Sequence, residues 1–307
     1  MNNPNSVSPS DFGRAEEPTN NSNAPKERER CESETDSFLK KQLKQAQGGR
    51  RRSLREPITH LKNKTFFEVV FGACFEDFGT QLTIEELVPF YDLKDDANTY
   101  FDNKCPDYDE ILRDMWLVLK GERLEEVEND GWKSYGFQNR NPRSDFRGGG
   151  LLSLKQLVYF VKSNKEKALE MSQKNEEFLF AVSSINITYF LIKYYHLSNN
   201  LIFSKDKKEI CSRVALKTFC SMLRVDQNVL NKIHGLLLED LYGVWGDIKK
   251  KVPGLTLMDF NMALNLVKSK FVRLTKSNSF DSFSQLKSFY TKLETVLPTR
   301  KASFSKK

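Results

Sequence analysis

The stretch from Trp132 to Phe160, WKSYGFQNRNPRSDFRGGGLLSLKQLVYF, decides which fold is expected. Its first half contains a proline and four glycines, which mark a loop, and its second half is apolar at helical spacing. Ser153 is followed three residues later by Gln156, the spacing of a capping box, which predicts that a helix opens there. The pattern therefore places Arg147 on a glycine-framed loop just before a helix.

The same stretch resembles the signature of the ELMO domain, in the form found in the smaller ELMO-domain-containing proteins that act as GTPase-activating proteins for Arf and Arl GTPases. The one departure is Ser144, where the family has Thr; because Ser keeps the hydroxyl, we expect little change. Residues 184–188 (SINIT) resemble a second, weaker landmark, and the resemblance covers roughly residues 64–275. The signature positions are Trp132, Gly136, Phe137, Gln138, Pro142, Asp145, Phe146, Arg147, Gly148, Gly150, Leu154, Leu157, Tyr159 and Phe160.

Composition and patterning predict a cytoplasmic protein with its own core. The chain has 307 residues, of which 39% are hydrophobic. Its longest charge-free apolar run, Phe178–Ile192, is 15 residues long and contains polar side chains, so it predicts a buried helix rather than a membrane span. The N-terminus begins with polar residues and proline instead of an apolar leader.

Cysteine and histidine usage argues against a metal centre or a disulfide framework. The five cysteines include no C-x2-C pair, and the three histidines form no H-E-x-x-H motif. We therefore expect free thiols, no metal site and no cofactor. The cysteines are Cys31, Cys74, Cys105, Cys211 and Cys220.

The net charge of +7 is carried by the flanks rather than by the centre of the chain. Residues 1–39 have a net charge of −4, residues 40–62 of +7 and residues 270–307 of +7, which leaves −3 for residues 63–269. This distribution does not suit a nucleic-acid groove. Two alternatives remain for the basic flanks, a solvated tail or contact with an anionic membrane surface as a peripheral protein.

Apolar periodicity predicts an all-α fold, a single multi-helix ELMO domain, because no segment alternates with period two. Residues 1–62 are expected to form a disordered, basic tail, residues 63–275 the ELMO domain, and residues 276–307 a C-terminal helix with a basic tail. Capping signals are Thr83 with Glu86, and Pro106 opening a helix that Gly121 closes. Apolar residues recur at helical spacing in further stripes: Phe66 to Ala73, Val214 with Leu223, Val229 to Val244, Phe260 to Val267, and Phe283, Leu286, Phe289 and Leu293.

The chain lacks the parts of a nucleotide-hydrolysing enzyme. It has no G-x4-G-K-[ST] loop and no evident nucleophile–base pair, so we expect no intrinsic catalysis. An arginine, however, suits phosphoryl transfer, because a permanently cationic fork stabilises charge on the phosphate oxygens in the transition state. The resemblance implies this role for Arg147, since activity in the GTPase-activating members depends on the arginine of D-F-R-G, which the scaffolds that pair with DOCK exchange factors lack.

The residues around Arg147 are expected to support it or to contact the GTPase. Asp145 either holds the guanidinium or binds the loop backbone, and the second is the commoner use of Asp beside Gly and Pro. Gln138 either contacts the GTPase or satisfies buried backbone groups. The glycines after Arg147 are expected to act as a backbone hinge, and the aromatic residues to brace the loop from the core. The complete supporting set is Trp132, Gly136, Phe137, Gln138, Pro142, Ser144, Asp145, Phe146, Gly148 and Gly150.

Two functional hypotheses follow. The first is a GTPase-activating protein for an Arf/Arl-family small GTPase in its GTP-bound form, with Arg147 supplied in trans. The alternative is a non-catalytic scaffold that binds a GTPase or a DOCK-type exchange factor. Arg147 favours the first, as does the shortness of the chain, because the scaffolds of the family carry additional armadillo-like and PH regions.

If residues 40–62 contact membranes, the chain will bind vesicles that contain anionic lipids. Each basic residue near such a surface contributes on the order of 1 kcal/mol, so binding should weaken steeply with added salt. Sedimentation with neutral and anionic vesicles at low and high salt measures this. Binding that ignores salt, or no binding at low salt, would leave the solvated-tail alternative.

Overall fold

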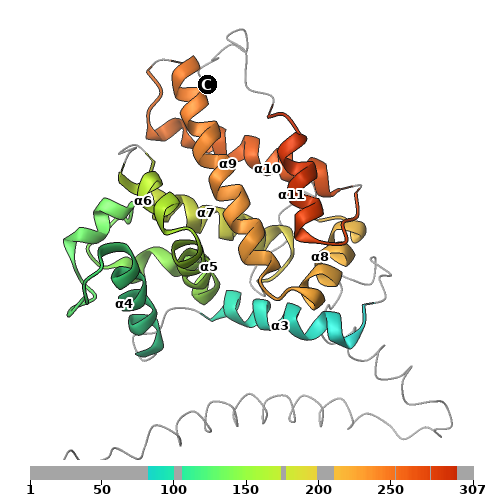
Figure 1. Ribbon diagram of the computed structural model, residues 1–307, viewed down its shortest axis with the longest axis horizontal. Helices are drawn as coiled ribbons and strands as arrows, with labels where there is room; N and C mark the ends of the chain where they lie inside the picture. The colour runs from blue at the N-terminus through green and yellow to red at the C-terminus, as the bar shows by residue number, and fades with distance from the viewer. Residues whose placement is uncertain are drawn as a thin grey trace, which may run out of the picture. The chain divides into compact units, whose positions relative to one another are not determined.

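The computed structural model describes residues 82–99, 106–173, 178–198, 211–252, 254–276 and 278–295. Within these ranges the chain forms α-helices and short 3-10 helices without any strand, which confirms the predicted all-α fold (Figure 1). The predicted tail, the stripe from Phe66 to Ala73 and three of the cysteines lie outside the described residues.

The described part of the chain contains α-helices and three short 3-10 helices, two of which lie between α4 and α5. The α-helices are α3 (Ile84–Asn98), α4 (Pro106–Lys120), α5 (Gly150–Ser163), α6 (Lys165–Gln173), α7 (Phe180–Tyr194), α8 (Arg213–Val225), α9 (Val229–Lys251), α10 (Phe260–Thr275) and α11 (Phe283–Lys292). The 3-10 helices are η1 (Asp130–Tyr135), η2 (Pro142–Gly148) and η4 (Leu257–Asp259).

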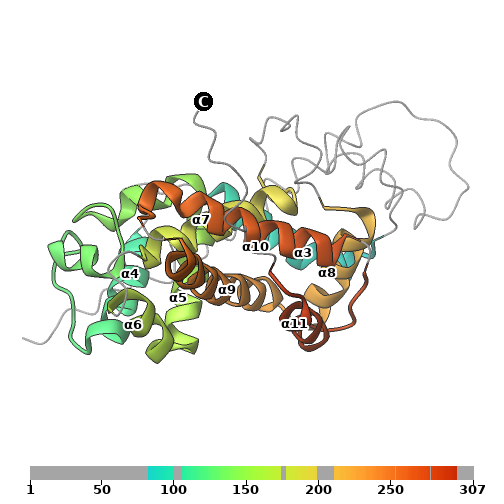
Figure 2. The same cartoon turned by 90° about the horizontal axis from the view of Figure 1, so that it is seen from above.

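Helix α9, the longest of the described helices, packs against α5, α7, α8, α10 and α11, whereas α3, α4 and α6 pack on α5. It contacts α5 and α7 on one side and α10 and α11 on the other (Figure 1), and α10 lies along it (Figure 2). Its side chains Val229, Ile233 and Leu237 are fully buried, as the apolar stripe in this segment predicts, and Trp245 is fully buried as well. Helix α7, the predicted buried helix, packs between α5 and α9. No described helix combines the length and apolar character needed to cross a membrane.

The capping signals around α3 and α4 are confirmed. Glu86 N donates to Thr83 Oγ1 at 3.3 Å, and Thr83 N donates to Glu86 Oε2 at 2.9 Å, which completes the capping box. Helix α4 begins at Pro106. It ends before Gly121, which has φ of +79° and donates its N–H to Leu117 O, so glycine is required at this position.

The capping box predicted at Ser153 is wrong, because α5 begins at Gly150. Ser153 and Gln156 lie inside the helix and are fully buried. Gln156 Oε1 accepts a hydrogen bond of 2.7 Å from Thr188 Oγ1 on α7, so its side chain joins two helices instead of capping one. The start of α5 is fixed by tertiary contact, since Leu151 N donates to Thr99 O at the end of α3.

Two predicted apolar stripes are buried only in part, since Leu286 and Leu223 are buried but Phe289 and Val214 are exposed. The last stripe forms α11, but the buried side chains are Leu286 and Tyr290, and Phe289 is 51% exposed. The helix turns this face inward because Tyr290 OH donates to Asp240 on α9 at 2.7 Å, where Lys270 of α10 also pairs with Asp240. Val214 is 45% exposed in the first turn of α8.

The helix interface holds a buried histidine. His234 of α9 is fully buried, and its Nε2 lies 3.0 Å from Ser184 Oγ and 3.2 Å from Ser184 O on α7. Within the described chain its Nδ1 has no hydrogen-bond partner. Burial lowers the pKa of His234 from 6.5 to about 4, an effect that the Ser184 carbonyl offsets in part. The folded protein therefore holds this ring neutral.

The free energy of unfolding should fall in mild acid because of His234. Its pKa is depressed in the folded state, so its contribution is intact above pH 6.5 and is lost as the pH falls towards 4. From this group we expect a loss of about 2 kcal/mol between pH 7 and pH 5. Urea unfolding of the wild type and of His234→Gln at both pH values measures the difference. Equal pH dependence in the two proteins would contradict the assignment.

Candidate functional site

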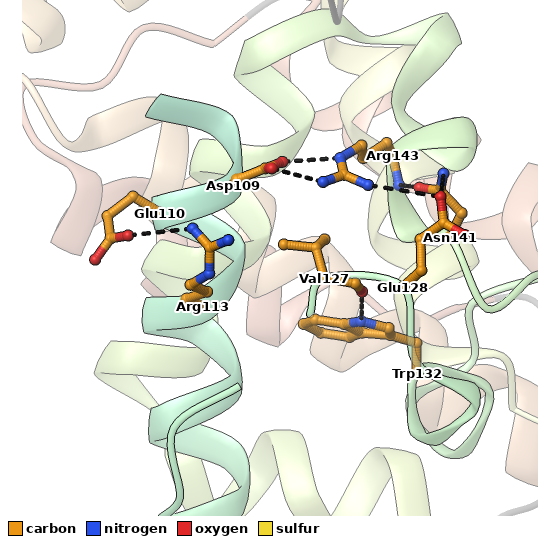
Figure 3. Close-up of polar contacts among 8 residues, drawn as sticks. All are labelled: Asp109, Glu110, Arg113, Val127, Glu128, Trp132, Asn141 and Arg143. Carbon is orange, nitrogen blue, oxygen red and sulfur yellow. Dashed lines mark hydrogen bonds and ion pairs between the residues drawn. The ribbon is translucent and has the colours of Figure 1, made fainter. Parts of the chain in front are cut away.

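A column of buried aromatic rings supports the segment that carries Arg147. Trp116 of α4 packs edge-on against Trp132 of η1 with ring centroids 4.8 Å apart. Trp132 continues to Phe137 at 5.3 Å, and Phe137 to Phe146 of η2 at 5.9 Å. Trp132 Nε1 donates to Val127 O at 2.8 Å (Figure 3). These rings brace the segment from the core, as expected, whereas Tyr159 of the same signature is only half-buried.

Gly136 brings the same segment against the start of α7. It has φ of +79°, a conformation that favours glycine. A Cβ atom there would lie 2.6 Å from the Leu179 carbonyl carbon and would also strike Phe180 N. Val182 N donates to Gly136 O at 3.3 Å. The signature glycine at this position is therefore a packing requirement that fixes the segment on α7.

The predicted loop around Arg147 is a short 3-10 helix, η2, which packs on α5 and α7. Asn141 is its N-cap, with its side-chain oxygen accepting from Arg143 N at 3.1 Å. The Asn141 amide donates to Glu128 Oε1 at 2.9 Å, which connects η2 to the chain before η1 (Figure 3). Pro142 occupies the first position and is buried. Proline suits this position because its missing N–H would have no partner there.

Asp145 holds the backbone of the segment rather than the guanidinium. Its Oδ2 accepts from Gln138 N at 2.8 Å, and Ser144 Oγ lies 3.2 Å from its Oδ1. Burial raises the pKa of Asp145, an effect that these two hydrogen bonds and the charge of Arg147 offset in part. No ion pair joins Asp145 to Arg147 within the described residues. Of the two roles predicted for Asp145, the structure shows the backbone role.

Arg147 lies on the last turn of η2 with an exposed side chain. Its Nε donates to Ser144 O at 2.8 Å, which restrains the side chain along the helix. The two terminal nitrogens form no hydrogen bond or ion pair with the part of the chain that the structure describes. The guanidinium is thus anchored at one nitrogen and presents the other two to solvent. A carboxylate or a phosphate can accept a hydrogen bond from each of these two nitrogens.

Arg143, on the same segment, forms an ion pair that its place in the sequence does not indicate. Its Nε and Nη2 donate to Asp109 of α4 at 2.8 and 2.6 Å, a bidentate pair visible in Figure 3. The exposed fractions of the two side chains are 18% for Arg143 and 28% for Asp109, so the pair is partly shielded from solvent. The partners are 34 residues apart, and no local spacing signals such a contact.

The glycines after Arg147 differ in what they do. Gly148 is exposed, whereas Gly149 and Gly150 are buried. Gly150 has φ of +56°, and a Cβ atom there would lie 2.7 Å from Thr99 O at the end of α3. Gly150 therefore allows close packing of α5 on α3, whereas a Cβ atom at Gly149 would strike the Ser153 side chain of α5. Both roles differ from the free hinge that the triple glycine suggested.

Gln138 is exposed, whereas the two described cysteines are buried. Gln138 has an exposed side chain that hydrogen-bonds to no described residue, so it does not satisfy buried backbone groups. Cys211 and Cys220 are free and buried, and burial raises the pKa of Cys211 to about 12. Across the described ranges, no group of three or more His, Cys, Asp or Glu side chains is placed to hold a metal ion.

Comparison with known proteins finds one family match. The model of the ELMO/CED-12 family matches residues 91–264, which include η1, η2 and all signature positions. ELMO domain-containing protein C of Dictyostelium discoideum is 25% identical over 186 residues, which are 60% of this chain and 29% of that protein. Human ELMO domain-containing protein 2 is 30% identical over 111 residues, or 32% of this chain and 38% of that protein.

The matched region is a small part of most of these relatives. In the Ankyrin repeat and ELMO domain-containing protein D of Dictyostelium discoideum, 26% identity over 203 residues covers 63% of this chain but 15% of the relative. The chain thus spans less than a third of the length of these two Dictyostelium discoideum relatives.

Removing the bidentate pair should destabilise the fold, whereas removing a neighbouring arginine should not. Arg143→Ala leaves Asp109 partly buried without its partner, so we expect a loss of about 2 kcal/mol in the free energy of unfolding. Arg140→Ala is the matched control on the same segment, because Arg140 is exposed, and should cost under about 0.5 kcal/mol. Urea denaturation measures both. Equal losses would show that the pair contributes no special stability.

Proposed function

Because the chain belongs to the ELMO/CED-12 family, we propose that it stimulates GTP hydrolysis by a small GTPase of the Arf/Arl type, with Arg147 supplied in trans to the nucleotide. The observation that carries this proposal is the state of the Arg147 side chain. It is exposed, it is restrained at Nε by Ser144 O, and its terminal nitrogens are open to a partner.

Phosphoryl transfer asks little covalent chemistry of the activating protein. In the transition state, charge spreads over the phosphate oxygens and the leaving group, and an arginine placed there stabilises it. The GTPase contributes the nucleotide, the magnesium ion and the attacking water. The activator contributes a guanidinium that does not lose its charge at physiological pH. An arginine already restrained in the free protein loses less conformational entropy when it enters the partner's site.

The geometry distinguishes Arg147 from the other arginines of the same segment. Arg143 is committed to Asp109 through two hydrogen bonds, and breaking that pair to reach a nucleotide would leave a partly buried carboxylate unpaired. Arg140 is exposed but precedes η2, and no hydrogen bond restrains its side chain among the described residues. Arg147 alone among the three combines exposure with a fixed direction.

The neighbours of Arg147 then have positioning roles. Asp145 ties η2 to the backbone of Gln138 and so sets the orientation of the turn that bears Arg147. Trp132, Phe137 and Phe146 form the support beneath it, and Pro142 and Ser144 shape η2. Gln138, exposed on the same segment, is available to contact the GTPase directly.

A non-catalytic scaffold that holds a GTPase or an exchange factor is the second candidate. The observation in its favour is that one relative joins this region to ankyrin repeats, as its name states, so the domain also occurs as one module of a larger protein. Binding without stimulation of hydrolysis distinguishes the scaffold from the activator.

Arg147→Ala should abolish stimulation without unfolding the protein. The charge stabilisation that it removes exists mainly in the transition state, so stimulated hydrolysis should fall by roughly 10³ to 10⁵, or about 4 to 7 kcal/mol. Arg147→Lys should rescue poorly because an ammonium lacks the planar fork. The measurement is single-turnover GTP hydrolysis by a panel of Arf and Arl proteins with the purified chain.

The control for this experiment is Arg140→Ala, which should keep full stimulation and equal stability. Because Arg147 is exposed, neither of its variants should lose more than about 0.5 kcal/mol in the free energy of unfolding. An Arg147→Ala protein that is folded, binds the GTPase and still stimulates hydrolysis would remove the catalytic role. A wild type that binds but never stimulates would favour the scaffold.

A further inference from the structure

Helix α7 exposes one large aromatic side chain in an otherwise buried stretch. Tyr189 is 37% exposed, whereas Ile187 and Thr188 are fully buried and Phe190 is 2% exposed. Exposed tyrosines are over-represented at protein interfaces, because they offer a large apolar area with few rotatable bonds and a hydroxyl that can hydrogen-bond.

The Tyr189 ring lies beside the residue that follows Arg147. A Cβ atom added to Gly148 would be 3.8 Å from Tyr189 Cδ2, which is ordinary van der Waals contact. The two elements also pack directly, since η2 contacts α7. The exposed aromatic side chain of α7 and the exposed arginine of η2 therefore belong to one continuous surface.

Lys193, one turn later on α7, restrains the ring. Its Nζ lies 4.6 Å from the centroid of Tyr189, within the range of a cation–π contact. Neither Lys193 nor Arg147 forms an ion pair in the described part of the chain. The Tyr189 ring thus has Lys193 of α7 over it and contacts the position of Gly148, which directly follows Arg147. A surface of this kind is complementary to one that is acidic and carries an apolar side chain.

We propose that Tyr189 and Lys193 form a docking surface for the GTP-loaded GTPase, with Tyr189 as the anchor that sets the position of Arg147 at the nucleotide. This inference rests on the proposed function and adds residues outside the D-F-R-G signature. Tyr189 and Lys193 act on the affinity for the GTPase, and Arg147 acts on the chemical step. The two roles predict different kinetic changes.

The test measures stimulated hydrolysis against the concentration of the GTP-loaded Arf or Arl protein that the wild type stimulates most. Tyr189→Ala should raise the KM for that GTPase about tenfold or more with kcat within twofold of the wild type, because truncating an interface anchor weakens binding. Tyr189→Phe keeps the ring and should restore most of the affinity. Lys193→Glu should raise KM most at low salt, because it removes an attractive charge.

Matched controls lie elsewhere on the protein. Phe289→Ala truncates an aromatic side chain of α11 that is 51% exposed, and Lys217→Glu reverses an exposed charge on α8. Both should leave KM and kcat unchanged. Binding of the same GTPase loaded with a non-hydrolysable GTP analogue, measured by interferometry, should show the same order of affinities.

The outcomes separate the two proposals. If the wild type stimulates hydrolysis and Tyr189→Ala leaves KM unchanged, the docking surface is wrong and the proposed function stands. If Tyr189→Ala lowers kcat as Arg147→Ala does, Tyr189 belongs to the catalytic step and the docking role is overturned. If the wild type stimulates no member of the panel, the proposed function fails, and the docking inference fails with it.

Discussion

The hydrogen bond from Gln138 N to the carboxylate of Asp145 is the contact on which the site depends. It joins the short 3-10 helix η2 to the irregular chain that precedes it. Asn141 and Ser144 bind further backbone groups of the same stretch, and the aromatic rings from Trp116 to Phe146 lie beneath it. Side chains thus satisfy backbone groups that the short 3-10 helices between α4 and α5 leave without a helical partner.

Local signals in the sequence predicted the helices well and the contacts between them less well. The capping box at Thr83 and the C-terminal Gly121 involve residues within four positions of each other, and both were confirmed. The box at Ser153 failed because Gln156 instead bonds to Thr188 on another helix. The pairing of Arg143 with Asp109 could not be predicted from one sequence, since the residues between them set its geometry.

The family signature combines two kinds of residue that single-sequence reasoning does not separate. Trp132, Phe137 and Phe146 are buried, whereas Gln138 and Arg147 are exposed, although all lie within one short segment. The buried members depend on packing, whereas the Gln138 side chain and the two terminal nitrogens of Arg147 bind no other group among the described residues. In physical terms, this contrast in burial, together with the pairing of Arg143 to Asp109, is why we propose a functional role for Arg147 rather than for Arg143.

The contact between Gly150 and the end of α3 has a mechanical consequence. Leu151 N donates to Thr99 O, and Lys155 pairs with Asp96 at 2.7 Å, so the last turn of α3 is bonded to the first turns of α5. These bonds hold the backbone that follows Arg147 against α3. The position of α3 is thus coupled through these contacts to the start of α5, which directly follows the turn that carries the arginine.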